Sequence, residues 1–581
     1  MDAIRLKING TDVSAPPGST ILEAAHGAGI RIPTLCWLKG VNELGACRIC
    51  VVEVKGMESL AAACVYPAKD GMEVFTNTPV LRKSRKTTLE LILSDHRRDC
   101  LSCRRNLSCE LQTLSIEYKV DQHAFSETDD FSDRLEETTE HLVRDNSRCI
   151  VCRKCASMCF YIQHVGAIGT NDRGFDANIG AAFDMPLEST SCVCCGQCVA
   201  VCPTGALIER DDTQKVWDAL ADASKHVIVA PAPSVRAQLG ECFGFPIGTN
   251  VSGKLAAALR RLGFDRVFDV DTAADVTIME EAAEFMGRLE KGGPFPLITS
   301  CSPGWVKFCE HYYHDMLVNI SSCKSPQQMY GALMKTYYAE KEGIEPRDIF
   351  VVSVMPCTAK KFEITREGQT ASGYPDVDVS ITTRELAAMI KQSTIIFEDL
   401  PDESFDPAFG IASGAGHIFG ATGGVMEAAL RTVAETLTGE TLSSVEFKEV
   451  RGSEKDIKEA EYILDGKKIK VAVTSGLSNA NKLINMVRKG EKELHFIEVM
   501  ACPGGCVNGG GAPFQPGYVH SFTDLRAERA KALYIQDEGM QIRKSHENPA
   551  VKEIYDSYLG RPGSPKAHKI LHTTYVPRKA F

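Results

Sequence analysis

The sequence predicts a multidomain protein that combines α+β and α/β folds, and three observations lead to this prediction. The chain has 581 residues, which exceeds one typical domain and suggests about three or four. Many of its 23 cysteines fall in short C-x2-C runs within a few segments. Beyond about residue 213, apolar runs alternate with amphipathic stretches, as they do in α/β domains.

Composition narrows the class of protein further. An apolar content of 44% and a charged content of 24% are typical of globular proteins. The net charge of −11, without a long basic run, argues against nucleic acid as a partner. No apolar segment approaches the length of a membrane span, and residues 1–5 lack the features of an export signal. We therefore expect a cytoplasmic protein whose clustered cysteines bind metal rather than form disulfides.

Residues 1–79 are predicted to form a small α+β domain. Residues 4–8 and 50–54 have the pattern of strands, and Ser19-Thr20 is a helix start before residues 21–26. Four cysteines follow one another in the spacing C-x10-C-x2-C-x13-C: Cys36, Cys47, Cys50 and Cys64. On ligand count they suit zinc or an iron–sulfur cluster equally. The segment resembles the [2Fe–2S] ferredoxin domain, a β-grasp fold, found at the front of larger redox enzymes.

Residues 80–130 are predicted to hold a second metal site. A helix is expected over residues 81–94. The pattern H-x3-C-x2-C-x5-C then places four ligands in one short segment: His96, Cys100, Cys103 and Cys109. This set also fits structural zinc, but the neighbouring iron–sulfur patterns favour a [4Fe–4S] cluster with one histidine ligand.

Residues 131–212 carry the most specific local pattern, after a polar run (122–140) that we expect to be a solvated loop. Two C-x2-C-x2-C-x3-C runs occur, and the second ends in Cys-Pro, as in bacterial two-cluster ferredoxins. In that pattern the fourth cysteine of each run binds the other cluster. One [4Fe–4S] cluster is therefore assigned to Cys149, Cys152, Cys155 and Cys202. The second is assigned to Cys192, Cys195, Cys198 and Cys159. Cys194 lies outside the register and is expected to be a packed thiol.

Residues 213–581 are predicted to be a large α/β domain. Strands are expected at residues 226–230, 266–270, 295–298, 349–354, 468–473 and 494–499. Cys301, Cys357 and the pair Cys502 and Cys506 follow three of these strands, where ligands of α/β sheets gather. The last pair lies in a glycine-rich loop that lets backbone approach a bulky group closely. The glycine-rich stretch 413–426 lacks a dinucleotide fingerprint, so we expect no nucleotide site.

Three motifs in this order behind the ferredoxin-like series resemble those of the iron-only ([FeFe]) hydrogenases. They are Thr-Ser-Cys301-x-Pro-Gly-Trp, Met-Pro-Cys357-x-x-Lys-Lys, and Cys502-x3-Cys506-x-Asn-Gly-Gly-Gly. The resemblance covers essentially the whole chain and is closest to the long clostridial-type members and the catalytic subunits of NADP-reducing hydrogenases. It implies an H-cluster, a [4Fe–4S] cubane joined through one cysteine sulfur to a two-iron unit with CO, cyanide and an azadithiolate.

The same resemblance implies roles for individual residues. Cys357 and Cys502 would hold the cubane, and Cys506 would bridge to the two-iron unit. Lys360 would donate to a cyanide nitrogen, since an ammonium suits a buried anionic acceptor. The remaining residues that would line the cofactor pocket are Pro233, Ser234, Gln327, Met355 and Met500.

One departure concerns Cys301 and Ser302. The family motif has two adjacent cysteines here, of which the first relays protons and the second binds the cubane. Alignment on Pro303 makes Cys301 the relay and leaves Ser302 Oγ, or an exchangeable ligand, at the fourth cubane corner. A shifted loop, in which Cys301 binds the cubane and the relay thiol is lost, remains the alternative, and Cys301 therefore counts among the possible metal ligands.

The resemblance also implies a proton route. Glu281, Glu284 and Arg288 share one face of a predicted helix, and Ser321 would connect them to Cys301. The alternative for both glutamates is an exposed acidic helix face. The remaining cysteines, Cys242, Cys309 and Cys323, match no ligand position and are expected to be buried thiols.

Together these features predict an enzyme that interconverts protons and H2, with electrons passing through one [2Fe–2S] and three [4Fe–4S] accessory clusters. Ferredoxin, or NAD(P)-binding flavoprotein and iron–sulfur subunits, would be its electron partners. Two alternatives are an H2-sensing relative of low turnover and a non-catalytic electron-transfer subunit resembling those of Complex I. The cysteines Cys357, Cys502 and Cys506, in their motifs, argue against the electron-transfer subunit.

Overall fold

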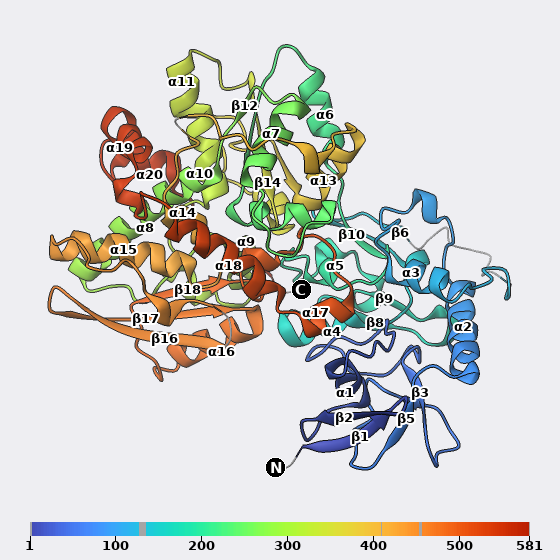
Figure 1. The fold of residues 1–581 in the computed structure, drawn as a ribbon. Coiled ribbons are helices and arrows are strands. Elements are labelled where there is room, and N and C mark those ends of the chain that lie inside the picture. Colours follow the sequence, from blue (N-terminus) through green and yellow to red (C-terminus); the bar gives the residue numbers. More distant parts are fainter. Residues whose placement is uncertain (1–2, 127–134, 408, 453–455, 580–581) are drawn as a thin grey trace.

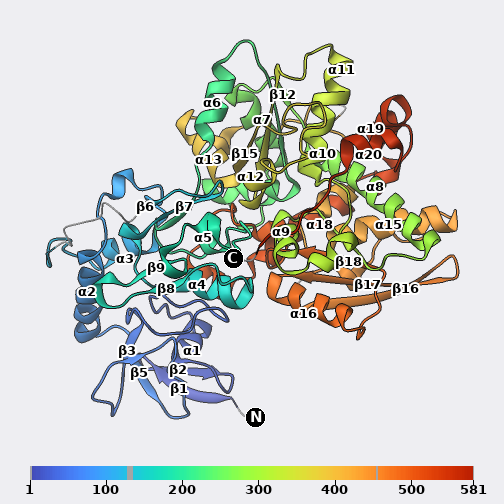
Figure 2. The same ribbon diagram turned by 180° about the vertical axis from the view of Figure 1, so that it is seen from behind.

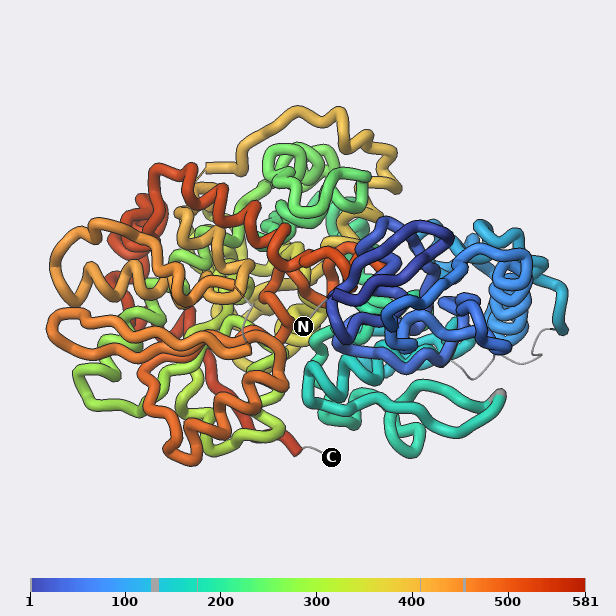
Figure 3. The backbone as a smooth tube through the Cα atoms, turned by 60° about the horizontal axis from the view of Figure 1, so that its bottom comes forward, coloured from blue at the N-terminus to red at the C-terminus, as the bar shows by residue number. Residues whose placement is uncertain are grey.

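The computed structural model describes residues 3–126, 135–407, 409–452 and 456–579 (Figure 1). The segments up to about residue 210 form one side of the molecule, and the large C-terminal part forms the other (Figure 3). Part of the polar run 122–140 lies outside the described residues, and its end contains a short strand, β6 (Leu135–Glu136). Among the described helices, none is both long and apolar enough to cross a bilayer.

The N-terminal domain is built around a five-stranded sheet in the order β2-β1-β5-β3-β4. Its elements are β1 (Ile4–Ile8), β2 (Thr11–Ala15), α1 (Ile21–Gly27), β3 (Val51–Val54), β4 (Ala61–Ala62) and β5 (Glu73–Phe75). Strand β1 pairs antiparallel with β2 and parallel with β5, the mixed pairing expected of a β-grasp fold. Helix α1 begins directly after Ser19-Thr20, as the sequence predicted, and a reciprocal capping box joins Thr20 to Glu23.

The middle of the chain has little regular structure, and its loops carry most of the cysteines. Helix α2 (Pro79–Ser94) lies where the sequence predicted a helix and is followed by α3 (Glu110–Glu117). Strands β7 (Leu142–Asp145) and β10 (Leu207–Glu209) form a small antiparallel sheet with β6. The short helices α4 (Lys154–Ser157) and α5 (Gln197–Ala200) each lie within one of the two cysteine runs.

The C-terminal part contains two separate four-stranded sheets, where the sequence predicted only a series of strands. The first, entirely parallel, comprises β12 (Arg266–Val267), β11 (His226–Pro231), β14 (Ile349–Met355) and β15 (Val379–Thr382) in that order. The second comprises β13 (Leu297–Ile298), β18 (Phe496–Met500), β17 (Lys467–Ser475) and the antiparallel β16 (Ile457–Leu464). Each sheet has its own hydrophobic core.

Two predicted strands are shorter than expected. The strand over 266–270 ends at Val267, because Asp269 caps the helix α8 (Val270–Lys291) through its side chain. The strand over 295–298 is reduced to β13, since Pro296 cannot donate a ladder hydrogen bond. Strands β15 and β16 were not predicted; β16 is an edge strand whose residues are mostly polar or exposed.

Candidate active site

The two sheets direct their strand ends toward one region. Cys301 follows β13 and Cys357 follows β14, while Cys502 and Cys506 follow β18. The helices that begin beyond the first two loops, α9 (Pro303–Tyr312) and α12 (Ala359–Glu363), contact each other between the sheets (Figure 2). The structure therefore brings together, from both sheets, the three motifs that the sequence singled out.

Three of these thiols, those of Cys357, Cys502 and Cys506, lie close together; Cys502 is buried and the other two are partly exposed. Burial, followed by the neighbouring Cys357 and Cys506 thiols, raises the pKa of Cys502 well above its ordinary value. Burial and Cys357 likewise raise the pKa of Cys506 to about 12. Thiols that lie this close together hold their protons, and a metal centre that replaces those protons stabilises the sulfurs as thiolate ligands. The donor set fits an iron–sulfur cubane.

Cys301 and Ser302 point to different neighbours. Burial, then the Glu281 carboxylate and the Cys506 thiol, raise the pKa of Cys301 well above its ordinary value, so both groups lie near its thiol. Ser302 Oγ accepts a hydrogen bond from the backbone N–H of Ala501 (3.1 Å), beside Cys502. Ser302 therefore contacts the loop of Cys502, whereas the Cys301 thiol has both Glu281 and Cys506 nearby.

Lys360 is buried at the same site with a fixed geometry. Its Nζ donates to Glu363 Oε2 (2.9 Å) and to the backbone oxygen of Cys301 (3.2 Å). Gln327 donates to Glu363 Oε2 (3.1 Å) and accepts from Ser353 Oγ (2.8 Å). Gln327 thus positions the carboxylate that holds Lys360, a second layer of support that the sequence did not reveal.

The other predicted wall residues also surround this region. Pro233 and Ser234 follow β11, and Met355 and Met500 are the last residues of β14 and β18; all four are buried. Among the described residues, the buried Oγ of Ser234 has no hydrogen-bond partner. A buried hydroxyl without a hydrogen-bond partner destabilises the fold, so a bound group that accepts a hydrogen bond from Ser234 fits this position.

The glycines after Cys506 serve close backbone packing. A Cβ on Gly510 would lie 2.6 Å from the backbone oxygen of Cys195, and one on Gly511 would lie 2.8 Å from the Thr382 side chain. The loop therefore approaches protein backbone, including that of an accessory-cluster segment, at distances only glycine allows.

We expect Gly510→Ala to destabilise the fold by about 1–3 kcal/mol, as overpacking does, and to reduce iron content, because Cys195 must move. Thermal unfolding and iron analysis of the anaerobically purified protein would measure both effects. Gly287→Ala is the control, since Gly287 has open space around it within α8. A normal Tm and full iron content in Gly510→Ala would contradict this packing argument.

The predicted proton-route residues lie one after another from Arg288 inward, and hydrogen bonds and ion pairs join them as far as Ser321. Arg288 contacts Glu284 Oε1 (2.6 Å), and Ser321 Oγ donates to Glu284 Oε2 (3.1 Å). Burial, then the Glu284 charge, raise the pKa of Glu281 to about 8, while the Ser321 hydroxyl close by lowers it in part. Glu281 is fully buried, which is incompatible with an exposed acidic helix face, and its carboxylate lies beyond standard hydrogen-bond distance from described partners.

The two ferredoxin-like runs are interleaved in space. One cavity is lined by four cysteines from both runs: Cys149, Cys152, Cys155 and Cys202. An adjacent cavity is lined by the other four: Cys159, Cys192, Cys195 and Cys198. The structure therefore groups the cysteines as the crossed ferredoxin pattern predicts.

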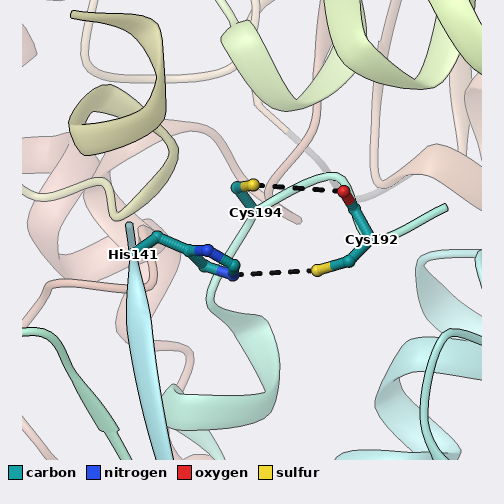
Figure 4. A group of neighbouring side chains, drawn as sticks. All are labelled: His141, Cys192 and Cys194. Atoms are coloured by element: carbon teal, nitrogen blue, oxygen red, sulfur yellow. Dashed lines mark hydrogen bonds between the residues drawn. The ribbon is translucent and has the colours of Figure 1, made fainter. Parts of the chain in front are cut away.

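Cys194 lies beside the second cavity, and its sulfur is within 4.8 Å of the Cys192 thiol and of a His141 ring nitrogen. In Figure 4, His141 Nε2 lies 3.7 Å from Cys192 Sγ, whereas Cys194 Sγ contacts the backbone oxygen of Cys192. Cys194 is buried, and the Lys307 ammonium lies 3.3 Å from its sulfur. These contacts agree with the predicted packed thiol.

Within each of the two N-terminal cysteine groups, the cysteines also lie close to one another. Cys50 Sγ lies 3.3 Å from Cys64 Sγ, and Cys36 Sγ accepts from the backbone N–H of Cys47 (3.4 Å). In the next segment, burial followed by Cys103 and Asp99 raises the pKa of Cys100. Burial raises the pKa of Cys109 to about 11.

His96 completes the second of these groups as a neutral imidazole. It is buried, its Nδ1 has no hydrogen-bond partner among the described residues, and burial lowers its pKa to about 4. A neutral imidazole with an unpartnered nitrogen fits a metal ligand.

Buried polar side chains link these groups in series. Asn42 Nδ2 donates to the backbone oxygens of Cys36 (2.6 Å) and Cys152 (3.0 Å). Arg105 donates to the backbone oxygen of Cys202 (2.9 Å), and Gln197 donates to that of Asn508 (2.8 Å). Both N-terminal cysteine groups therefore adjoin the first ferredoxin-like site. The second ferredoxin-like site adjoins the loop of Cys502 and Cys506.

Comparison with family models divides the chain into five matches. Residues 225–510 match the iron-only hydrogenase large subunit, C-terminal domain, and residues 523–578 match the iron hydrogenase small subunit. Residues 1–79 match a 2Fe-2S iron-sulfur cluster binding domain. Residues 85–124 match the NADH-ubiquinone oxidoreductase-G iron-sulfur binding region, and residues 134–206 match a 4Fe-4S dicluster domain.

Individual relatives match at full length. The chain is 48% identical to the NADP-reducing hydrogenase subunit HndD of Solidesulfovibrio fructosivorans, covering 100% of both chains. It is 44% identical to iron hydrogenase 1 of Clostridium pasteurianum, covering 98% of this chain and 99% of that one. A solved structure of the [FeFe]-hydrogenase HydA1 from Chlamydomonas reinhardtii superimposes with a TM-score of 0.57 and 41% identity, covering 64% of this chain and 100% of that chain.

Proposed function

Since the chain belongs to the iron-only hydrogenase family, we propose that it interconverts protons and H2 at an H-cluster held by Cys357, Cys502 and Cys506. The observation that carries this proposal is the close grouping of these three thiols. The relay residues lead toward them through Glu281 and Cys301, and Cys502 lies close enough to the Cys195 thiol to raise the pKa of Cys195. Protons and electrons can therefore arrive at the same place by separate routes.

The bound H-cluster supplies the redox chemistry, and the protein supplies binding and proton delivery. Cys301 is assigned as the last proton donor, because Glu281 and Cys506 both lie near enough to its thiol to raise its pKa. Protons would enter at Glu284, pass the Ser321 hydroxyl and reach Glu281, which holds a proton near neutral pH. Lys360 and Ser234 would stabilise anionic groups in the pocket.

Electrons would reach the H-cluster through one [2Fe–2S] and three [4Fe–4S] clusters. The Asn42 and Arg105 contacts place both N-terminal sites next to the site of Cys149, Cys152, Cys155 and Cys202. From there the path continues through the adjacent site to Cys502. Two possible entry points suggest that the chain receives electrons from more than one kind of partner.

Infrared spectroscopy of the matured, anaerobic protein tests the central proposal. Bound CO and cyanide should give sharp bands, and the same sample should evolve H2 from reduced viologen. Bands without turnover would favour the H2-sensing alternative, and a fully loaded protein without bands would favour the electron-transfer subunit.

The His96 ligand assignment leads to a second prediction. His96→Cys should retain an assembled [4Fe–4S] centre with a lower reduction potential, because a thiolate makes the site more anionic than an imidazole does. Redox titration followed by electron paramagnetic resonance would measure the shift. Unchanged iron content and spectra in both His96→Cys and His96→Ala would exclude His96 as a ligand.

A third prediction concerns the electron partner. We expect the isolated chain to turn over with ferredoxin or viologen but not with NAD(P)H, since its sequence lacks a dinucleotide fingerprint. NAD(P) would require a flavoprotein subunit, which agrees with the relative that is named a subunit of an NADP-reducing hydrogenase. Rapid NAD(P)H oxidation by the pure single chain would contradict the prediction.

A further inference from the structure

A cluster of three potential metal ligands lies at the outer end of the proposed proton route. Glu284, Cys323 and His572 each offer one ligand atom, and these atoms lie within 4.8 Å of one another. The Cys323 sulfur is 4.0 Å from Glu284 Oε2. Thiolate, imidazole and carboxylate are the ligands that zinc prefers, and three protein ligands leave its fourth position to water.

His572 is oriented as a metal-binding histidine. Its Nε2 donates to Glu280 Oε2 (3.0 Å), a buried carboxylate that also accepts from Tyr555 OH (2.6 Å) and the Gly563 N–H (2.9 Å). These donors leave the Glu280 oxygens in the role of acceptors, which fixes the proton of His572 on Nε2. The lone pair of Nδ1 therefore points into the cluster, where Ser322 Oγ lies 2.8 Å away. Carboxylate–histidine pairs of this kind are the usual outer shell of protein zinc sites.

The backbone holds the ligands in place. Cys323 and His572 face each other in an isolated antiparallel bridge. Lys324 N–H donates to the Leu571 oxygen (2.8 Å), and Thr573 N–H donates to the Ser322 oxygen (2.8 Å). The site is also accessible, because the Glu284 side chain is 17% exposed to solvent.

The charges allow a cation on one oxygen of Glu284. Arg288 occupies Oε1, and its positive charge opposes a metal. Burial and the Glu284 charge raise the pKa of Cys323 well above its ordinary value, so its sulfur offsets that effect only once a metal replaces its proton, together with the Glu280 carboxylate. Oε2 remains, and it is the oxygen to which Ser321 Oγ (3.1 Å) and the Ser322 N–H (3.0 Å) donate. A metal on Oε2 would displace the Ser321 hydroxyl from the proton route.

We propose that Glu284, Cys323 and His572 bind Zn²⁺ with a fourth ligand from water, and that zinc bound there inhibits turnover. The inhibition rests on the proposed proton route, whereas the binding does not. The two parts can therefore be tested separately.

Zinc K-edge X-ray absorption of the anaerobic holoenzyme, titrated with Zn²⁺ alone, tests the binding. The spectrum should show one sulfur at about 2.3 Å and nitrogen or oxygen ligands at about 2.0–2.1 Å. Cys323→Ala should lose the sulfur contribution. Glu280→Gln should keep it but weaken binding by about 10–100-fold. Cys309→Ala, which removes another buried thiol, is the matched control and should bind normally.

H2 evolution by the same samples tests the inhibition. Zn²⁺ should slow the wild type and Cys309→Ala, and Cys323→Ala should keep its turnover and be at least about tenfold less sensitive. A sulfur contribution that persists in Cys323→Ala, or is absent from the wild type, would overturn the site. Zinc bound at Cys323 without inhibition would support the site and overturn the proton route through Glu284.

Discussion

Cys301→Ala should abolish nearly all H2 evolution while leaving the cofactor in place. General acid–base groups typically contribute about 10²–10⁴-fold to the rate, and the Cys301 thiol is assigned as the last donor between Glu281 and the cofactor. Turnover with reduced viologen should fall by this factor. The infrared bands of bound CO and cyanide and the iron content should match the wild type, which separates a relay from a cubane ligand.

Ser302→Cys also tests whether Cys301 is the proton relay or the cubane ligand. Under the relay assignment, a cysteine here adds a fourth thiolate beside Cys502, since Ser302 already contacts Ala501. It should therefore stabilise the cubane without changing proton transfer. A large gain in activity, or loss of iron in Cys301→Ala, would favour the shifted loop in which Cys301 binds the cubane. Full activity and full iron content in Cys301→Ala would refute both assignments.

Local signals account for what could be predicted from the sequence. The strand at residues 4–8, the helix start at Ser19-Thr20, and helix α2 depend on neighbouring residues, and the structure reproduces them. The cysteine groups were predictable because short spacings bring their ligands together. The crossed partners Cys159 and Cys202 came from the ferredoxin pattern, not from spacing alone.

Features that depend on long-range packing could not be predicted in this way. Nothing local assigns β13 and β14 to different sheets, although the active site lies where the ends of both sheets meet. Ser322 and His572 are 250 residues apart, so their contact has no sequence signal. The support of Lys360 by Glu363 and Gln327 was missed for the same reason, although the i, i+3 spacing of Lys360 and Glu363 on a helix was a usable hint.

Glu281→Gln should also reduce turnover by about 10²–10⁴-fold, because an amide of the same shape cannot take up and release a proton. Wild-type Glu281 keeps its proton up to a pKa of about 8 and can pass it to Cys301 below that pH. The rate of H2 evolution should therefore fall as the pH rises through about 8, and the variant should lack this step. Glu290→Gln, on the exposed end of α8, is the matched control.

The same substitution should change how stability depends on pH. An exposed glutamate releases its proton near 4.5, whereas Glu281 in the folded protein holds it to about 8. Between these values the unfolded state binds fewer protons than the folded state, so the free energy of unfolding contributed by Glu281 falls as the pH rises. Glu281→Gln removes this fall in the free energy of unfolding. The Tm of the variant relative to the wild type should therefore increase from pH 5 to pH 8. A Tm difference that stays constant over this range would show that Glu281 is ionised in the folded protein and is no proton donor.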